Sequence, residues 1–236
     1  MMLNYVSRAL NQIKANGLPA SLLQLWNRFG TNDVFLAVIF ETNQQDEAML
    51  QEYQRNGYTL QIITKSSPPE LISKLSELYG LDYFIRSYPL NISVPRRNEF
   101  VKARLHDGEL CFAILYDGDI AHINWVGFEN TWHENKMILA QNLKIDLSTT
   151  AYSYNNYAVE QYRGRKLQLL CFFHIFKFLK DHGYQYLYGL IGSRNTASMK
   201  ICSLVGRFTG VVIGTNYFVF KKYIFLPMEF PYFFKR

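Results

Sequence analysis

The sequence predicts a mixed α/β fold in which helices flank a central sheet, and two patterns carry this prediction. Two apolar segments, 109–116 and 119–126, are joined by Asp117-Gly118, a pair typical of the type I′ turn of a hairpin. Further along, an apolar strand pattern ends in a basic glycine turn, and a long apolar helix pattern continues from it over 167–180. An antiparallel hairpin beside such a strand–helix unit indicates a mixed sheet.

Composition is that of a packed globular protein. Of the 236 residues, 49% are hydrophobic and 19% are charged, which separates the chain from disordered sequences. No apolar run is long enough for a transmembrane helix, and no secretory signal is recognised, so we expect a cytoplasmic protein. The scattered Cys111, Cys171 and Cys202 fit buried reduced thiols, and with five dispersed histidines they indicate no metal site.

The net charge of +6 fits a partner that carries phosphate. Three partners have this chemistry: a phosphorylated cofactor, a nucleic acid and an anionic membrane surface. A nucleic-acid module usually shows a basic stripe or aromatic–basic motifs, and neither is present here. We therefore expect no nucleic-acid partner, and steeply salt-dependent binding to nucleic acid would contradict that expectation.

The first 30 residues have an amphipathic helical pattern that breaks near Gly17. Two interpretations are open. The helix packs on the domain or on the partner of a homodimer, or it makes peripheral contact with the inner face of a membrane through its lysine, arginine and tryptophan residues. This segment resembles the N-terminal helices of enzymes from bacterial surface-glycan clusters.

The remaining elements are predicted from local signals. Strands are expected at 33–41, 58–64, 146–159, 184–191 and 217–225, and helices at 66–80, 167–180 and 195–205. Residues 43–56 are helical or loop, the stretch with Pro89, Pro95 and Arg96-Arg97 is irregular, and 132–143 is a helix or a long connection. We expect an N-terminal elaboration, 1–100, packed on a second domain, 101–236, which contains the motifs described next.

The most informative segment is the basic turn before the long helix. It reads Gln161-Tyr162-Arg163-Gly164-Arg165-Lys166. The first amides of a helix have no intrahelical partner, and the helix dipole adds partial positive charge there, so such a turn binds anions. Gly164 lets the backbone approach a phosphate closely.

Together with the residues downstream of it, this turn resembles the GCN5-related N-acetyltransferases. The family's pyrophosphate loop has the pattern Gln/Arg-x-x-Gly-x-Gly/Ala, and the family's later motif starts at an Asn, matched here by Asn195, with Ser198 three residues on and Gly206 near the end. The resemblance spans about Arg104 to Tyr223. Lys166 departs from the small residue of the loop, and Cys202 stands where the family often has a tyrosine that protonates the departing thiolate.

The resemblance implies a mostly antiparallel sheet with a splayed pair of parallel strands, here about 152–159 and 186–191. Acetyl-CoA, or another acyl-CoA, would lie in the gap with its pyrophosphate on the loop. The residues implied to bind it are Val159, Gln161, Tyr162, Arg163, Gly164, Arg165, Lys166, Leu167, Asn195 and Ser198. The amides of 163–167 would hold the pyrophosphate, and the amide near Val159 would stabilise the oxyanion.

The catalytic candidates are Cys202, Glu160 and Tyr154. Cys202 either protonates the thiolate or is a small buried residue. Glu160 is a general base or a solvent-facing carboxylate, and Tyr154 is an acceptor ligand or a packing residue.

Trp125 and Tyr152 are candidates for the acceptor wall, each with a role in the core as the alternative. His122 is a base or a structural histidine. His133 and Glu134 border the acceptor or lie on the surface.

The resemblance implies an acyl-CoA-dependent N-acyltransferase that acts on a primary amine of a small molecule, and the resemblance of the N-terminal segment makes an amino sugar one such acceptor. The amine would attack the thioester directly, and the reaction would need no metal. The alternative is a non-catalytic acyl-CoA-binding or membrane-associated module with the same fold, which the cysteine at position 202 keeps open.

Overall fold

The computed structural model describes residues 33–79, 94–129, 131, 145–217 and 220–227. The expected helix at 1–30, the connection at 132–143, Pro89, and the tail after 227 lie outside these residues. None of the helices in the described part of the chain combines the length and apolarity that crossing a bilayer requires.

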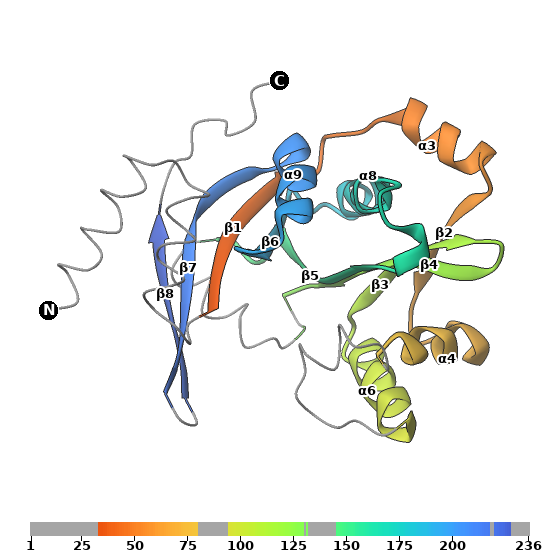
Figure 1. Cartoon of the computed structure of the whole chain (residues 1–236), viewed down its shortest axis with the longest axis horizontal. Helices are drawn as coiled ribbons and strands as arrows, with labels where there is room; N and C mark the ends of the chain where they lie inside the picture. Colours follow the sequence, from red (N-terminus) through yellow and green to blue (C-terminus); the bar gives the residue numbers. More distant parts are fainter. Residues whose placement is uncertain (1–32, 80–93, 130, 132–144, 218–219, 228–236) are drawn as a thin grey trace, which may run out of the picture.

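Among the residues that the structure describes, eight strands form one sheet in the order β2-β3-β4-β5-β6-β1-β7-β8 (Figure 1). They are β1 (Asp33–Glu41), β2 (Tyr58–Ile63), β3 (Leu110–Tyr116), β4 (Asp119–Gly127), β5 (Thr150–Ala158), β6 (Tyr186–Gly192), β7 (Arg207–Tyr217) and β8 (Phe220–Pro227). Every neighbouring pair is antiparallel except β5 and β6, which are parallel. The predicted fold class, a mostly antiparallel mixed sheet with one parallel pair, is confirmed.

Helices cover the two faces of the sheet. They are α3 (Glu47–Arg55), α4 (Pro69–Leu78), α6 (Val94–His106), α8 (Leu167–Asp181) and α9 (Thr196–Val205). Helices α3, α8 and α9 lie on one face, and α4 and α6 lie on the other (Figure 1). The core on the α8 face contains the buried Phe172 and Phe176 with Phe40 and Phe112 from the sheet, and a second core joins α4 and α6 to β3 and β4.

The predicted hairpin is confirmed. Strands β3 and β4 are joined at Asp117 and Gly118, whose φ angles are 51° and 77°. Two consecutive residues with positive φ are what a type I′ turn requires, and its twist matches that of the paired strands.

Two expectations about secondary structure were wrong. The stretch with Pro95 and Arg96-Arg97 is helical, because α6 begins at Val94 and a proline fits the first turn of a helix, where its missing N–H is not needed. Residues 207–217 form the long strand β7, which no local pattern predicted. The last strand accordingly starts at Phe220.

Strand β1 lies inside the sheet, between β6 and β7, and pairs with both. Its side chains Leu36 and Val38 are 1% exposed. Strand β2, also from the first 100 residues, pairs with β3. The sheet therefore runs across residue 100, and the N-terminal segment supplies strands to it as well as helices.

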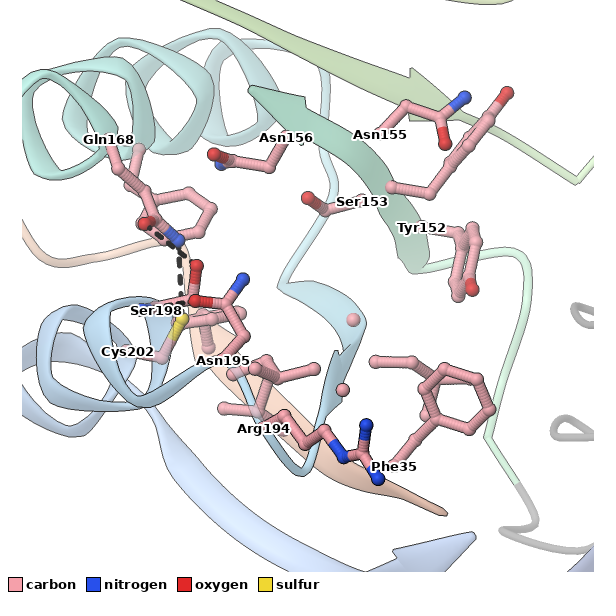
Figure 2. A pocket seen from close by; sticks show the side chains of 18 residues that line it. Phe35, Tyr152, Ser153, Asn155, Asn156, Gln168, Arg194, Asn195, Ser198 and Cys202 are labelled. Carbon is pink, nitrogen blue, oxygen red and sulfur yellow. Dashed lines mark hydrogen bonds between the residues drawn. The ribbon is translucent and has the colours of Figure 1, made fainter. Parts of the chain in front are cut away.

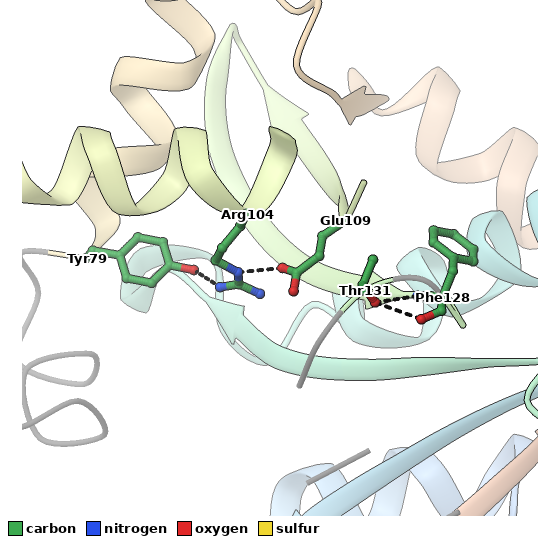
Figure 3. A network of polar contacts seen from close by, with 5 residues as sticks. All are labelled: Tyr79, Arg104, Glu109, Phe128 and Thr131. Atoms are coloured by element: carbon green, nitrogen blue, oxygen red, sulfur yellow. Dashed lines mark hydrogen bonds and ion pairs between the residues drawn. The ribbon is translucent and has the colours of Figure 1, made fainter. Parts of the chain in front are cut away.

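A buried ion pair links α6 to the residue before β3 (Figure 3). Arg104 Nε donates to Glu109 Oε2 at 2.6 Å, and the two side chains are 9% and 6% exposed. Another guanidinium nitrogen donates to the Tyr79 hydroxyl at 2.6 Å. The guanidinium carbon lies 3.6 Å from the ring centroid of Trp125. Hydrogen bonds and an aromatic face thus take the place of the water that both charges lost.

We expect Glu109→Gln to lower the free energy of unfolding by about 3 kcal/mol, because the buried Arg104 charge would lose its counterion. Denaturant titration measures this change. Asp119→Asn is the matched control: it breaks the exposed Lys74–Asp119 pair, which has a similar separation of 3.0 Å, and should cost less than about 1 kcal/mol. Equal losses in the two variants would contradict the role given to burial.

Candidate functional site

The parallel strands β5 and β6 separate partway along their length. Their register contains four residue pairs and ends at Ser153 and Gly189. Beyond that point β5 continues to Ala158 and stays paired with β4 on its other side. The backbone of β5 that faces the gap can therefore pair with an extended ligand, as an added strand would.

A bulge in β5 accompanies the separation. Ile123 pairs with Tyr157 and Trp125 pairs with Tyr154, so two residues of β5 face one residue of β4. Asn155 takes the extra position with φ 50°, a left-handed conformation that asparagine adopts more readily than most residues. The bulge changes the side-chain alternation and brings Tyr154 and Tyr157 into the same hydrophobic cluster. The splayed pair of parallel strands that the family resemblance implied is present.

After β5 the chain forms the 3-10 turn η1 (Glu160–Tyr162) and then the basic turn before α8. The first amides bonded to helix carbonyls are those of Leu169 and Leu170, both on the Lys166 carbonyl. The amides from Gly164 onward precede these bonds and lie at the positive end of the helix dipole. The Arg163 amide instead donates to the Glu160 carbonyl at 3.1 Å, so the amide cradle starts one residue later than expected.

Two positions of this turn have positive φ: 79° at Gly164 and 54° at Lys166. They are the two positions where the family pattern has small residues. A lysine in the left-handed region costs roughly 1–2 kcal/mol in backbone strain, but the conformation still forms. Lys166 therefore departs from the pattern in its side chain and keeps the expected backbone.

Aromatic residues of the N-terminal segment hold the turn in place. The Tyr53 hydroxyl donates to the Arg165 carbonyl, and the Arg165 guanidinium donates to the Tyr58 hydroxyl at 2.8 Å. The guanidinium also lies over the Tyr162 ring, 5.5 Å from its centroid. Helix α3 and strand β2 thereby fix the back of the turn.

Two adjoining cavities follow the gap. The loop cavity, about 740 Å³, is bordered by the basic turn, by Ala158 and by the first residues of α9. The strand cavity, about 410 Å³, lies between β5 and β6 and reaches β1 (Figure 2). Both are lined by Asn156, Gln168, Arg194, Asn195 and Ser198. The shared lining places the two cavities next to each other, one at the basic turn and one in the gap between the strands, and we call the two together the path.

Most residues predicted to bind the cofactor border this path. Tyr162, Arg163, Gly164, Arg165, Lys166, Leu167, Asn195 and Ser198 line the loop cavity. Gln161 and Val159 line neither cavity. The Val159 amide donates to the Ala121 carbonyl at 3.0 Å, so it does not offer the oxyanion donor that we expected there.

The catalytic candidates are placed differently from one another. Glu160 lines neither cavity and its side chain is 89% exposed, as expected for a solvent-facing carboxylate. Cys202 is buried and lines the strand cavity, where Gln168 Nε2 lies 3.6 Å from its sulfur and Gln168 Oε1 accepts from Ser198 at 3.2 Å (Figure 2). Burial raises the pKa of the Cys202 thiol, which therefore stays protonated.

Tyr152 and Tyr154 both line the strand cavity, and their rings stack with centroids 5.3 Å apart. The Tyr154 hydroxyl interacts with Glu109 and Arg104, and burial raises its pKa far above the usual value. Trp125 does not reach the acceptor wall: it is fully buried, it lines neither cavity, and it lies under Arg104 on the α6 face of β4.

Sequence reasoning missed several residues of the path. Asn156 lies in the predicted strand before the basic turn, and Gln168 lies in the predicted helix after it. The bulge in β5 and the orientation of α8 bring them to the gap, and neither can be seen in the sequence. Arg194 comes from the turn before α9, and its side chain extends away from Gln168 toward Phe35 (Figure 2). In the described part of the chain, no three His, Cys, Asp or Glu side chains group as metal ligands.

Known proteins were compared with the chain by sequence and by structure. No protein-family model and no curated protein sequence matches it. In structure it is similar to the GCN5-related glucosamine N-acetyltransferase region of a fungal multi-domain GH3 β-N-acetylglucosaminidase, with a TM-score of 0.54 and 11% identity over 81% of this chain. It is also similar to a conserved protein of unknown function from Staphylococcus epidermidis, with a TM-score of 0.50 and 9% identity over 80% of this chain.

The chain spans 22% of the fungal protein and 64% of the staphylococcal protein. At such low identities the similarity concerns the fold. It agrees with the splayed strand pair, the bulge and the amide cradle. The chain has the fold of the GCN5-related N-acetyltransferases.

Proposed function

We propose that this protein is an acyl-CoA-dependent N-acyltransferase, and that acetyl-CoA is its acyl donor. The observation that carries the proposal is the pair of adjoining cavities, one at the amide cradle at 164–168 and one in the gap between β5 and β6. The amide cradle suits a diphosphate, and the gap between the strands suits an extended thiol-bearing arm. These are the two halves of CoA.

The charges along the path favour this ligand. Among the described residues that line the two cavities, the charged side chains are all cationic: Arg163, Arg165, Lys166, Arg194 and Lys200. A diphosphate and a 3′-phosphate would be attracted to the end of the path at the basic turn, where most of these cations lie. The exposed side chains contribute by long-range attraction, and the fixed amides give the close contacts.

The cationic lining also affects the protonation of the acceptor amine. An amine must be neutral to attack the thioester, and nearby positive charge lowers the pKa of a bound amine. No carboxylate is among the described residues that line either cavity. We propose that the amine loses its proton to water on entering the site, and that a side-chain base is not needed.

The acceptor enters the strand cavity from the side of Phe35 and Tyr152. Aromatic rings there suit the apolar face of a sugar, and the fungal protein of similar fold is described as a glucosamine N-acetyltransferase, which supports an amino sugar as acceptor. Arg194 is the charged residue on this side, so an acidic group on the acceptor would be favoured and a polycationic acceptor disfavoured.

Cys202 is proposed as the proton donor to the CoA thiolate. It borders the strand cavity and carries its proton before the transfer; because burial raises the pKa of its thiol, it gives up that proton only to a strongly basic thiolate. The contact with Gln168 Nε2 orients its sulfur. The alternative function, a module that binds acyl-CoA without transfer, remains the outcome if no acceptor is turned over.

We expect Gly164→Glu to weaken CoA binding at least about tenfold, because the side chain adds negative charge where the diphosphate would lie. Isothermal titration with CoA measures the effect. Gly183→Glu is the matched control, since Gly183 also has positive φ, 82° against 79°, and open space, but lies at the other end of α8. If Gly164→Glu binds CoA with unchanged affinity, the diphosphate does not bind at this turn.

The acceptor class is tested with glucosamine and glucosamine 6-phosphate. We expect a higher kcat/KM for the phosphorylated amine, and Arg194→Gln should lower kcat/KM more for glucosamine 6-phosphate than for glucosamine, which reduces that preference. Thiol release from acetyl-CoA is the assay, and Arg207→Gln, an exposed arginine outside both cavities, is the control. A raised KM for acetyl-CoA in Arg194→Gln would instead assign Arg194 to the coenzyme.

Cys202→Ala should lower kcat about tenfold or more while the KM for acetyl-CoA stays near the wild-type value, because only protonation of the leaving thiolate is removed. Cys202→Ser, which keeps a proton donor, should retain more activity than the alanine variant. Wild-type rates for Cys202→Ala over a range of pH would make this cysteine a packing residue.

A further inference from the structure

Three polar side chains near the path have buried nitrogen atoms without a hydrogen-bond partner among the described residues. They are both ring nitrogens of His122 and the amide nitrogens of Asn124 and Asn156. His122 is 1% exposed and lines the loop cavity, and Asn156 lines both cavities. Asn124 is completely buried, and its oxygen accepts from Ser153, a residue of the strand cavity.

Such groups are costly to leave without partners. A buried donor or acceptor without a hydrogen bond destabilises the folded state, and native proteins contain few of them. His122 and Asn124 lie on one strand, and Asn156 lies on the next, opposite Asn124 in the bulge. Apolar side chains at these positions would avoid the cost. Their grouping beside one cavity indicates that they serve a ligand with hydrogen-bonding groups of its own.

The chemistry of His122 narrows the class of ligand. Burial lowers its pKa to about 3, so the ring is neutral at ordinary pH. A neutral imidazole has one N–H donor and one acceptor nitrogen. That pair is complementary to an amide, which offers a carbonyl oxygen and an N–H. Because a ring with this pKa takes up protons poorly, we assign it no role as a base.

Position along the path gives the order of contacts. His122 is opposite Ala158, next to the basic turn, and Asn156 lies two residues further into the gap. A chain that leaves the amide cradle and runs along β5 passes His122 first and Asn156 second. The strand cavity begins at Asn156. The pantetheine arm of CoA carries two amides between its diphosphate end and its thiol.

We propose that His122 and Asn156 are positioning residues that hydrogen-bond the two amide groups of the pantetheine arm. The inference rests on the proposed function, since it takes CoA to be the ligand of the path. The two side chains hold the arm at a fixed depth in the gap and so place the thioester in the strand cavity. They contact the arm and not the reacting atoms.

The test compares two ligands, CoA and adenosine 3′,5′-bisphosphate, by isothermal titration. The bisphosphate carries phosphates of the nucleotide end but has no arm. His122→Leu should weaken CoA binding about tenfold and leave bisphosphate binding unchanged. The melting temperature of the ligand-free variant should rise, because two buried nitrogens without partners are replaced by an apolar side chain. A protein that becomes more stable and binds CoA less tightly would not be expected of a residue with a purely structural role.

Asn156→Ala should show the same selectivity between the two ligands, and His122→Gln, which keeps a donor and an acceptor, should recover part of the CoA affinity. Ile123→Val is the control, since this neighbour of His122 is fully buried on the opposite face of β4. It should lower the melting temperature and leave both affinities unchanged.

Three outcomes overturn the inference. CoA affinity stays at the wild-type value in both His122→Leu and Asn156→Ala, or both ligands weaken equally, or His122→Leu lowers the melting temperature while CoA binds normally. If His122→Leu does not fold, His122→Gln and Asn156→Ala decide the question with the same two ligands. If the wild-type protein binds neither ligand, the proposed function fails before the inference is reached.

Discussion

The short parallel pairing of β5 and β6 is the constraint on which the rest of this molecule depends. The two strands share four residue pairs and then separate, because β5 stays with β4 and carries a bulge at Asn155. A fully paired sheet would leave no room between them. The separation exposes strand backbone, opens the strand cavity, and directs the end of β5 to the basic turn that begins α8.

The site built around this separation relies on fixed dipoles and distributed positive charge. Amides at the start of α8 lie at one end of the path, and the charged side chains that line its described part are arginines and lysines. Such a lining lowers the proton affinity of an incoming amine and attracts phosphate. In the proposed acyl transfer, one arrangement would thus serve two requirements, retention of the donor and a neutral nucleophile.

Local signals in the sequence predicted the elements whose contacts are close along the chain. Asp117-Gly118 marked the hairpin, and Asn195 marked the start of α9, where its side chain caps the Ser198 amide at 3.0 Å. Strand β7 was missed because its partner β1 lies near the other end of the chain, and pairing between distant segments leaves no local pattern. The place of β1 within the sheet was unforeseen for the same reason.

The site was predicted at the level of its backbone and less well at the level of its side chains. Spacing located the turn from Gly164 to Leu167, because glycine and helix-start signals act within a few residues. It did not show that the Val159 amide is already bonded to Ala121 or that Glu160 faces solvent. Those facts depend on register and on the orientation of η1, which are set by the partner strand.

The position of β1 has a consequence for synthesis on the ribosome. This strand is made before both of its sheet neighbours, β6 and β7, which follow it at a long distance along the chain. An apolar strand stays uncovered at both edges until these later segments have been made, which slows folding and favours association with other strands.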